Sequence, residues 1–180
     1  MSDSTTTTPR IIGTLRRTDA PGIDTGTVRM HDRFDTTVDD LWSAITDRDR
    51  AARWIGQLDG ELSLGGTFHA RLTSHWEGSA RVDACEAPHR LLVTMRPGES
   101  DETVFEAWLT EVDGAADLVV EERGLPLGEI FAHGAAWQAH IEDLAAHVAG
   151  RTPAPWESRW HELSPLYAAM ASRIDRAERA

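Results

Sequence analysis

Apolar and polar residues alternate along several short segments of the chain, and glycine and proline residues separate these segments. The first strand-like segment, residues 27–34, precedes a compact helical pattern, and six further strand-like segments follow. A long amphipathic pattern then covers residues 129–150, where apolar side chains recur with the period of an α-helix. This order predicts an α+β fold in which a curved antiparallel sheet of about seven strands wraps around one long helix and leaves a cavity between them.

Two short helices are predicted directly after the first strand. Thr37 and Asp40 have the spacing of a capping box, and the apolar residues behind them recur at helical spacing. Asp47 is a suitable cap for a second helix that runs to Ile55 and ends at Gly56. The first of these helices is expected to face the core.

The termini add three features to this core. Residues 1–10 are expected to form a disordered tail, because the threonine-rich stretch is polar and of low complexity. Residues 11–17 predict an extra strand, joined to residues 27–34 through a turn at Pro21 and Gly22. We therefore expect one domain over residues 11–150 and a helical extension over residues 151–180.

The pattern on two neighbouring strands identifies an unusual carboxylate. Asp113 and Gly114 predict a tight hairpin turn between these strands. Pairing outward from the turn places six side chains on one face: Phe105, Ala107, Leu109, Leu118, Val120 and Glu122. Five of them are apolar, so Glu122 is predicted to be a carboxylate on the inner surface. Glu106, on the opposite face, and Arg71, in an earlier strand, are expected to face water.

The long helix carries one apolar stripe that is expected to face the sheet: Ile130, His133, Trp137, Ile141, Leu144 and Val148. His133 lies in this stripe and can hydrogen-bond or exchange protons near neutral pH. His140 and His147 are expected to line a solvated edge of the helix, and a pair of imidazoles at the rim of the cavity is the alternative. Together with Asp143 they have a spacing that metal ligands can adopt, but no HExxH pattern accompanies them, so we expect no metal.

Composition excludes several classes of function. The net charge is −12, which disfavours nucleic-acid backbones. No apolar run approaches the roughly 20 residues of a membrane span, and the N-terminus lacks the apolar core of a signal peptide, so a cytoplasmic protein is expected. Cys85 is the single cysteine, and all 18 basic residues are arginine, which leaves no lysine for Schiff-base chemistry. No cofactor is expected.

Several short motifs occur in the order and spacing of a known superfamily. They are FDTTVDDLWSAITD at residues 34–47, ARWIG at 52–56, LGGTF at 64–68, EAPHRL at 86–91 and the helix segment 136–144. The chain thereby resembles the activator of heat-shock ATPase homologue-like group of the SRPBCC/START-like superfamily, over roughly residues 28–150. The resemblance implies a helix-grip fold with an internal cavity. Members include lipid carriers, polyketide cyclases, hydrolases and co-chaperone modules, so it leaves the activity open.

Tryptophans mark two further surfaces. Trp76 lies at a predicted hairpin tip, where its ring either covers a pocket mouth or is presented to a partner. In the extension, apolar residues from Trp156 to Ile174 recur at helical spacing, and Ser164–Pro165 is expected to divide this segment into two helices. Their apolar face is expected to pack on the domain, and a homodimer through this face is the alternative.

These observations favour a protein that binds a small apolar or aromatic molecule in its cavity. The expected contacts come from the helix, the inner sheet face and the second short helix: Trp54, Phe68, Phe105, Glu122, His133, Trp137 and Ile141. One alternative is an enzyme of polyketide cyclase or hydrolase type that uses Glu122 and His133 as its acid–base pair. Another alternative is a co-chaperone-like interaction module.

Overall fold

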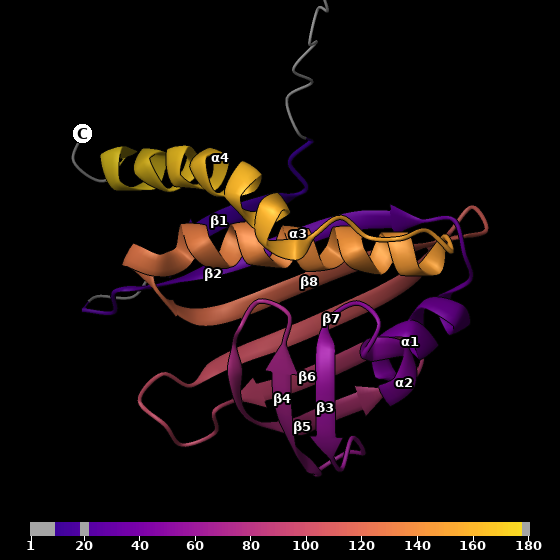
Figure 1. The fold of residues 1–180 in the computed structure, drawn as a ribbon. Coiled ribbons are helices and arrows are strands. Elements are labelled where there is room, and N and C mark those ends of the chain that lie inside the picture. The colour runs from indigo at the N-terminus through magenta and orange to yellow at the C-terminus, as the bar shows by residue number, and fades with distance from the viewer. Residues whose placement is uncertain (1–9, 19–21, 178–180) are drawn as a thin grey trace, which may run out of the picture.

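The computed structural model describes residues 10–18 and 22–177 of the chain. In this part of the chain, eight strands form one antiparallel sheet, and the long helix α3 lies across one face of it (Figure 1). The strands are β1 (Gly13–Arg17), β2 (Thr25–Phe34), β3 (Gly56–Gly60), β4 (Thr67–Leu72), β5 (Glu77–Glu86), β6 (Arg90–Met95), β7 (Thr103–Val112) and β8 (Ala115–Pro126). The helices are α1 (Val38–Thr46), α2 (Arg48–Ala51), η1 (Leu127–Glu129), α3 (Ile130–Val148) and α4 (Trp156–Ala177).

The strand order is β1-β2-β8-β7-β6-β5-β4-β3, so the early strand β2 pairs with the last strand, β8. This arrangement confirms the predicted α+β helix-grip fold, with seven strands in the core and the extra N-terminal strand β1 paired to β2. The predicted turn residue Pro21 lies outside the described residues, as does the expected disordered tail except for Arg10.

The β7–β8 hairpin has the register that the sequence predicts. Asp113 and Gly114 have φ values of 51° and 76°, the left-handed values that a two-residue hairpin turn of this kind requires. Val112 therefore pairs with Ala115, and further along Phe105 pairs with Glu122. Because the register holds over the whole hairpin, Glu122 lies on the inner face among apolar side chains.

The two short helices begin as predicted, but the second is shorter than expected. Thr37 Oγ1 accepts a hydrogen bond from the Asp40 amide at 3.1 Å, which caps α1. The prediction that α2 runs to Ile55 is wrong, because the helix ends at Ala51 and a turn leads into β3. Gly56 begins that strand with φ of 136°, and a Cβ there would lie 2.2 Å from a carbonyl oxygen of β4. The glycine therefore serves the close pairing of β3 with β4 and does not terminate a helix.

The helix α3 buries the predicted stripe against the sheet, and α4 packs on its other side. Ile130, Ile141 and Leu144 are almost fully buried. A Cβ at Gly134 would lie 2.5 Å from the ring of Tyr167 in α4, so glycine is required for this close helix–helix contact. The Tyr167 hydroxyl is buried and donates to a side chain of α3.

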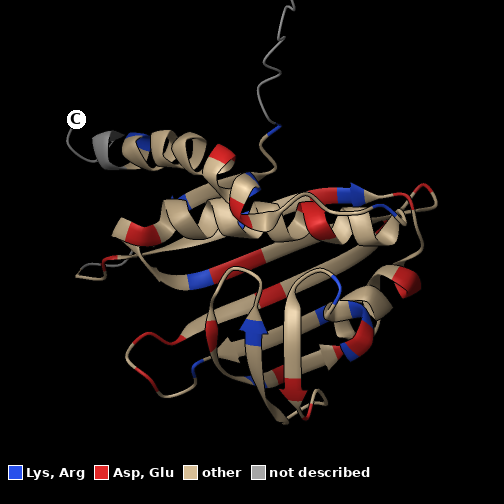
Figure 2. Cartoon of the chain, viewed as in Figure 1, with Lys and Arg blue, Asp and Glu red and all other residues tan. Residues whose placement is uncertain are grey.

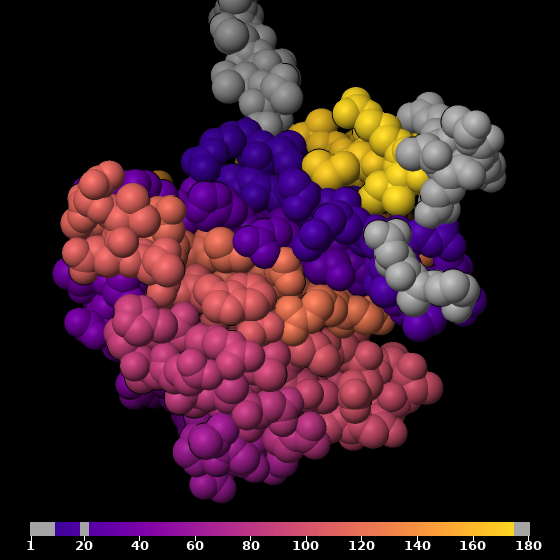
Figure 3. All heavy atoms as spheres, turned by 180° about the vertical axis from the view of Figure 1, so that it is seen from behind, coloured from indigo at the N-terminus to yellow at the C-terminus, as the bar shows by residue number. Residues whose placement is uncertain are grey.

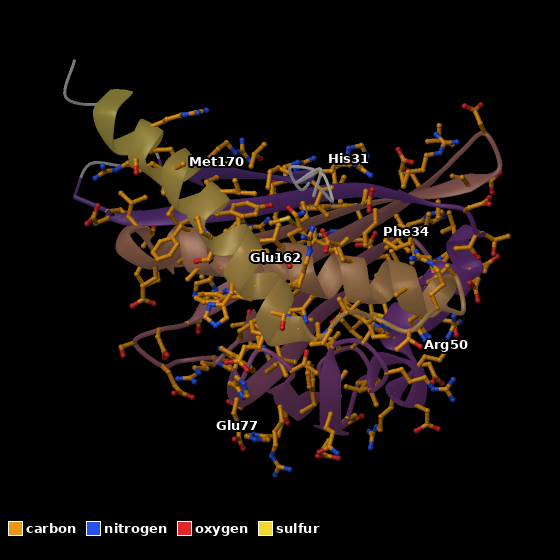
Figure 4. All side chains as sticks on the ribbon, turned by 45° about the horizontal axis from the view of Figure 1, so that its top comes forward. His31, Phe34, Arg50, Glu77, Glu162 and Met170 are labelled. Atoms are coloured by element: carbon orange, nitrogen blue, oxygen red, sulfur yellow. The ribbon has the colours of Figure 1, made fainter. Side chains whose placement is uncertain are left out.

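The C-terminal segment is one helix, and the predicted division at Ser164–Pro165 is wrong. Proline lacks only one amide donor, and packing compensates for it: the flanking residues Leu163 and Tyr167 are fully buried. Figure 4 shows α4 lying over α3, with Glu162 and Met170 labelled along it. The apolar face of α4 is thus used within the chain, and the homodimer stays a prediction.

The outer face of the sheet differs from its predicted exposure at Glu106 and at its cross-strand partner Glu121, which is also buried. Arg71 is exposed as predicted, but Glu106 is only 5% exposed, so the expectation that it faces water is wrong. Arg90 and Arg123 cover it with hydrogen bonds of 2.7 and 2.6 Å. Figure 3 shows this face from behind as successive bands of strands, and Figure 2 shows acidic and basic residues interspersed along them.

Candidate functional site

The candidate site is built around Glu122, on the inner face of β8. Its side chain is buried and accepts hydrogen bonds from the Thr103 hydroxyl at 2.8 Å and from the Trp137 indole Nε1 at 2.6 Å. His133 Nδ1 lies 3.3 Å from the same carboxylate. Since β7, β8 and α3 each supply one or more of these groups, the site depends on the predicted hairpin register and helix stripe.

The Glu122–His133 pair favours its charged form. Burial acts to raise the pKa of Glu122, but the hydrogen bond and charge of His133, with Trp137 and Thr103, outweigh it and hold the pKa below its usual value. Burial acts to lower the pKa of His133, yet Glu122 and, less strongly, Glu129 raise it above its usual value. Both shifts favour the charged forms, a carboxylate on the inner face of β8 and an imidazolium on the facing side of α3.

Aromatic rings extend from this pair toward α4. Phe105 stacks on Trp137 with ring centroids 4.9 Å apart, and His140 meets the edge of Trp137 at 5.8 Å. Trp156, in the first turn of α4, lies 5.5 Å from His140 and stacks on Trp160. A continuous series of rings thus connects the sheet, α3 and α4.

A pocket of about 550 Å³ lies against this series. Its walls come from α3, the β4–β5 hairpin with the neighbouring end of β6, and the first turns of α4, and Glu122 of β8 also lines it. In Figure 4, Glu77 marks the hairpin wall and Glu162 the helix α4. Trp76, at the hairpin tip, lines the pocket, and the guanidinium of Arg96 lies 5.4 Å from its ring centre. Of the two alternatives for Trp76, the structure supports a ring at the pocket mouth.

Three polar atoms at the pocket wall lack a hydrogen-bond partner within the described part of the chain. They are Arg96 Nε, His140 Nε2 and Trp156 Nε1, and each is buried. Burial lowers the pKa of His140 to about 4, so this imidazole is neutral at physiological pH. Buried polar atoms without partners are unusual in folded proteins, so their concentration at one pocket indicates a place for a ligand or for water.

The structure distributes the predicted site residues between the pocket and the core. Glu122, His133 and Trp137 line the pocket. Phe105 lies behind Trp137, and Phe68 is half-buried on β4. Trp54 and Ile141 are core residues, and the Trp54 indole donates to a backbone carbonyl of α1.

Other pocket residues were not among the predicted ligand contacts, although a position of His140 at the cavity rim was the alternative to a solvated edge. The expectation that His140 lines a solvated edge is wrong, because Trp156 covers it and leaves it 2% exposed. Arg96 follows β6 without any distinguishing motif. Trp156 and Trp160 belong to the apolar face of the C-terminal extension. For these two residues, that face was the sequence signal from which a pocket wall could have been predicted.

Neither a metal-binding cluster nor a membrane-spanning helix occurs in the described part of the chain. In residues 10–18 and 22–177, no group of three or more His, Cys, Asp or Glu side chains is placed to hold a metal ion. Over the same ranges, the helices contain no apolar stretch long enough to cross a bilayer.

Known structures share this fold. CalU16 from Micromonospora echinospora is 24% identical, and its crystal structure has a TM-score of 0.71 over 89% of this chain and 97% of CalU16. The EF2215 protein of Enterococcus faecalis is 18% identical, with a TM-score of 0.69 over 90% of this chain and 91% of that protein.

DynU16, a protein of the dynemicin biosynthetic locus, is 27% identical with a TM-score of 0.64, over 71% of this chain and 49% of DynU16. Among curated proteins no sequence matches the chain. The model of the family described as "Activator of Hsp90 ATPase homolog 1-like protein" matches residues 35–149, from the segment before α1 to the end of α3. The chain belongs to this family.

Proposed function

We propose that this protein binds a small, flat and largely apolar molecule in the pocket between α3, the β4–β5 hairpin and α4. One observation carries the proposal. A pocket of about 550 Å³ is lined by aromatic rings, and its wall residues include buried polar atoms that have no hydrogen-bond partner within the described residues. Ligand pockets of proteins combine this size range with mostly apolar walls and a few placed polar groups. The similarity to DynU16, a protein of the dynemicin biosynthetic locus, supports a small molecule as the ligand class.

The position of the tryptophans supports a flat ligand. Trp76, Trp156 and Trp160 approach the pocket from the hairpin and from α4, while Trp137 lies on α3. Aromatic faces stack on flat π systems and bury large areas with little loss of side-chain freedom. A planar molecule between these rings would therefore gain contact on more than one side.

The test is a binding screen with a variant that fills the pocket. Flat aromatic compounds are titrated against the protein, with tryptophan fluorescence and the melting temperature as readouts, because a ligand of the folded state raises the melting temperature. Ala136→Phe adds a ring at the α3 wall of the pocket and is expected to abolish binding. Ala149→Phe adds the same ring at an exposed position after α3 and serves as the matched control.

A screen without binders, together with an unchanged melting temperature, contradicts the proposal. The interaction-module alternative would then be the better account, and association with a chaperone would be the measurement to make. Binding that survives in Ala136→Phe would place the ligand elsewhere on the molecule.

A second candidate function, an enzyme of polyketide cyclase or hydrolase type, is favoured by the Glu122–His133 contact of 3.3 Å at the pocket wall. An imidazole held by a carboxylate is a common acid–base arrangement. Turnover of a bound compound that is lost in His133→Gln while its binding persists would establish this function, and turnover that persists in His133→Gln would exclude it.

A further inference from the structure

The free polar atoms of the pocket are mostly hydrogen-bond donors. Trp156 Nε1 and Arg96 Nε each carry a hydrogen and have no acceptor capacity, and both are buried without a partner within the described residues. A buried donor that stays unpaired loses its hydration without compensation. A ligand with acceptor atoms would remove this penalty, whereas a purely apolar ligand would leave it in place.

Two of the three carboxylates that line the pocket are engaged by other side chains. Both oxygens of Glu122 accept hydrogen bonds, one from Thr103 and the other from Trp137. Glu77, on the hairpin wall, lies within hydrogen-bond distance of His69 at 2.9 Å and of Arg71 at 3.1 Å. The third, Glu157, is exposed in the first turn of α4, so the buried carboxylate of the pocket is occupied while two buried N–H donors have no partner within the described residues.

His133 adds a donor that carries charge. Its Nδ1 lies beside Glu122, its side chain is 30% exposed, and it lines the pocket. In the imidazolium form both ring nitrogens donate, so Nε2–H remains for a ligand after Nδ1–H has bonded to Glu122. Burial acts to lower the pKa of His133, but the Glu122 contact raises it above its usual value, which favours this form near neutral pH.

We propose that the ligand is a flat aromatic molecule that carries an acidic oxygen, and that His133 Nε2 donates to this oxygen while Trp156 Nε1 and Arg96 Nε donate to further oxygens. The inference rests on the proposed function, since it names the chemical class of the ligand in the same pocket. Phenolate, enolate and carboxylate oxygens share the required chemistry, because each accepts charge-assisted hydrogen bonds.

The test compares two probes that differ in one group. 8-Anilinonaphthalene-1-sulfonate contains the rings of N-phenyl-1-naphthylamine together with an anionic sulfonate, and both dyes report binding by fluorescence. We expect the sulfonate to bind on the order of tenfold more tightly than the neutral dye, which corresponds to one charge-assisted hydrogen bond. His133→Gln is expected to remove this preference and to leave the affinity for the neutral dye within about twofold.

Matched controls separate the pocket from the rest of the molecule. His31→Gln changes an exposed histidine of β2 outside the pocket and is expected to keep the preference (Figure 4). Ala136→Phe is expected to block both dyes, which excludes binding elsewhere on the surface. Trp156→Phe is expected to weaken the sulfonate more than the neutral dye.

The pH dependence gives an independent readout, because the sulfonate stays charged throughout the neutral range. The titratable or charged groups that share the pocket or act on His133 are Glu122, Glu129, His75, Glu77, Arg96, His140, Glu157 and His161. We expect the preference for the sulfonate to fall as pH rises through the pKa of His133, above its ordinary value of 6.5. In His161→Gln the preference for the sulfonate is expected to fall with rising pH as in the parent protein. In His133→Gln this pH dependence is expected to disappear.

The outcomes distinguish the inference from the function on which it rests. If neither dye nor any compound of the screen binds, the proposed function fails. If the neutral dye binds as tightly as the sulfonate, or if the preference survives in His133→Gln, the function stands and the acidic-oxygen inference is overturned.

Discussion

Glu121 and Glu122 are neighbours on β8, point to opposite faces of the sheet, and are both almost completely buried, with exposures of 7% and 5%. On the outer face, Glu121 pairs with Arg16, Arg29 and Arg123. On the inner face, Glu122 meets two neutral donors and a single histidine. The same side chain is thus held by fixed positive charges on one side and by a titratable group on the other.

The partners of the carboxylates differ because the outer face must separate two like charges, whereas the inner face lines the pocket. Glu106 and Glu121 are direct cross-strand partners, an arrangement of like charges that destabilises a sheet unless cations separate them. Arginine stays protonated at all relevant pH values, so the ion pairs that Glu106 and Glu121 make on the outer face do not depend on pH through their cations. The inner pair contains His133, a titratable group whose pKa Glu122 raises above its usual value, and the pair lies at a pocket wall. A charge that can change its state therefore lies where a ligand can reach it.

The largest expected effect comes from removing the ring that supports the inner carboxylate. Trp137→Ala deletes a buried ring, its stack on Phe105 and its hydrogen bond to Glu122, and is expected to lower the free energy of unfolding by about 3–5 kcal/mol. Trp108→Ala, on the half-buried outer face of β7, is expected to cost less than half as much. Urea unfolding of both variants makes the comparison, and equal losses would contradict it.

Amide substitution compares the inner carboxylate Glu122 with Glu106, a carboxylate of the outer face. Glu122→Gln places an amide beside buried donors that cannot reach water, and is expected to cost about 2–3 kcal/mol. Glu106→Gln is expected to cost only about 1 kcal/mol, because partly exposed Arg90 and Arg123 can replace the lost charge with water. Chemical denaturation at pH 7 measures the free energy of unfolding of both variants. A larger loss for Glu106→Gln than for Glu122→Gln would contradict the expectation that the inner carboxylate is the more tightly constrained one.

Acid is expected to lower the free energy of unfolding of the protein, because His140 is buried as a neutral imidazole. Burial lowers the pKa of His140 to about 4 in the folded protein, so protons bind the unfolded chain more strongly between pH 6.5 and 4. Stability is therefore present above pH 6.5 and decreases as pH falls, by about 3 kcal/mol over this interval. His140→Gln is expected to flatten this decrease relative to the parent protein, whereas His31→Gln is expected to leave it unchanged. An equally steep decrease in His140→Gln would show that other groups are responsible.

The smallest effect is expected where a donor has no partner to lose. Trp156→Phe removes an unpaired N–H, so the free energy of unfolding is expected to change by less than about 1 kcal/mol. Trp160→Phe removes an indole that donates to the Ala132 carbonyl at 3.1 Å, and is expected to cost about 1 kcal/mol more. Thermal unfolding of the pair provides the measurement. A larger loss in Trp156→Phe would mean that its N–H has a partner in solution.

The sequence by itself determined the features that depend on local geometry. The Asp113–Gly114 turn sets the register of β7 and β8, and the period of two along each strand then places Glu122 on the inner face. The apolar stripe of α3 orients His133 and Trp137 toward the sheet, and Thr37 begins α1. Each of these features follows from residues close together in the chain.

Only the tertiary structure decided that Glu106 and His140 are buried and where the pocket lies. Glu106 is on the predicted face, but Arg90 and Arg123, from two other strand segments, cover it. His140 is buried because α4 folds back and places Trp156 against it. Period and turn chemistry are local properties of the chain, whereas coverage by long side chains and by a distant helix depends on contacts that no single segment specifies.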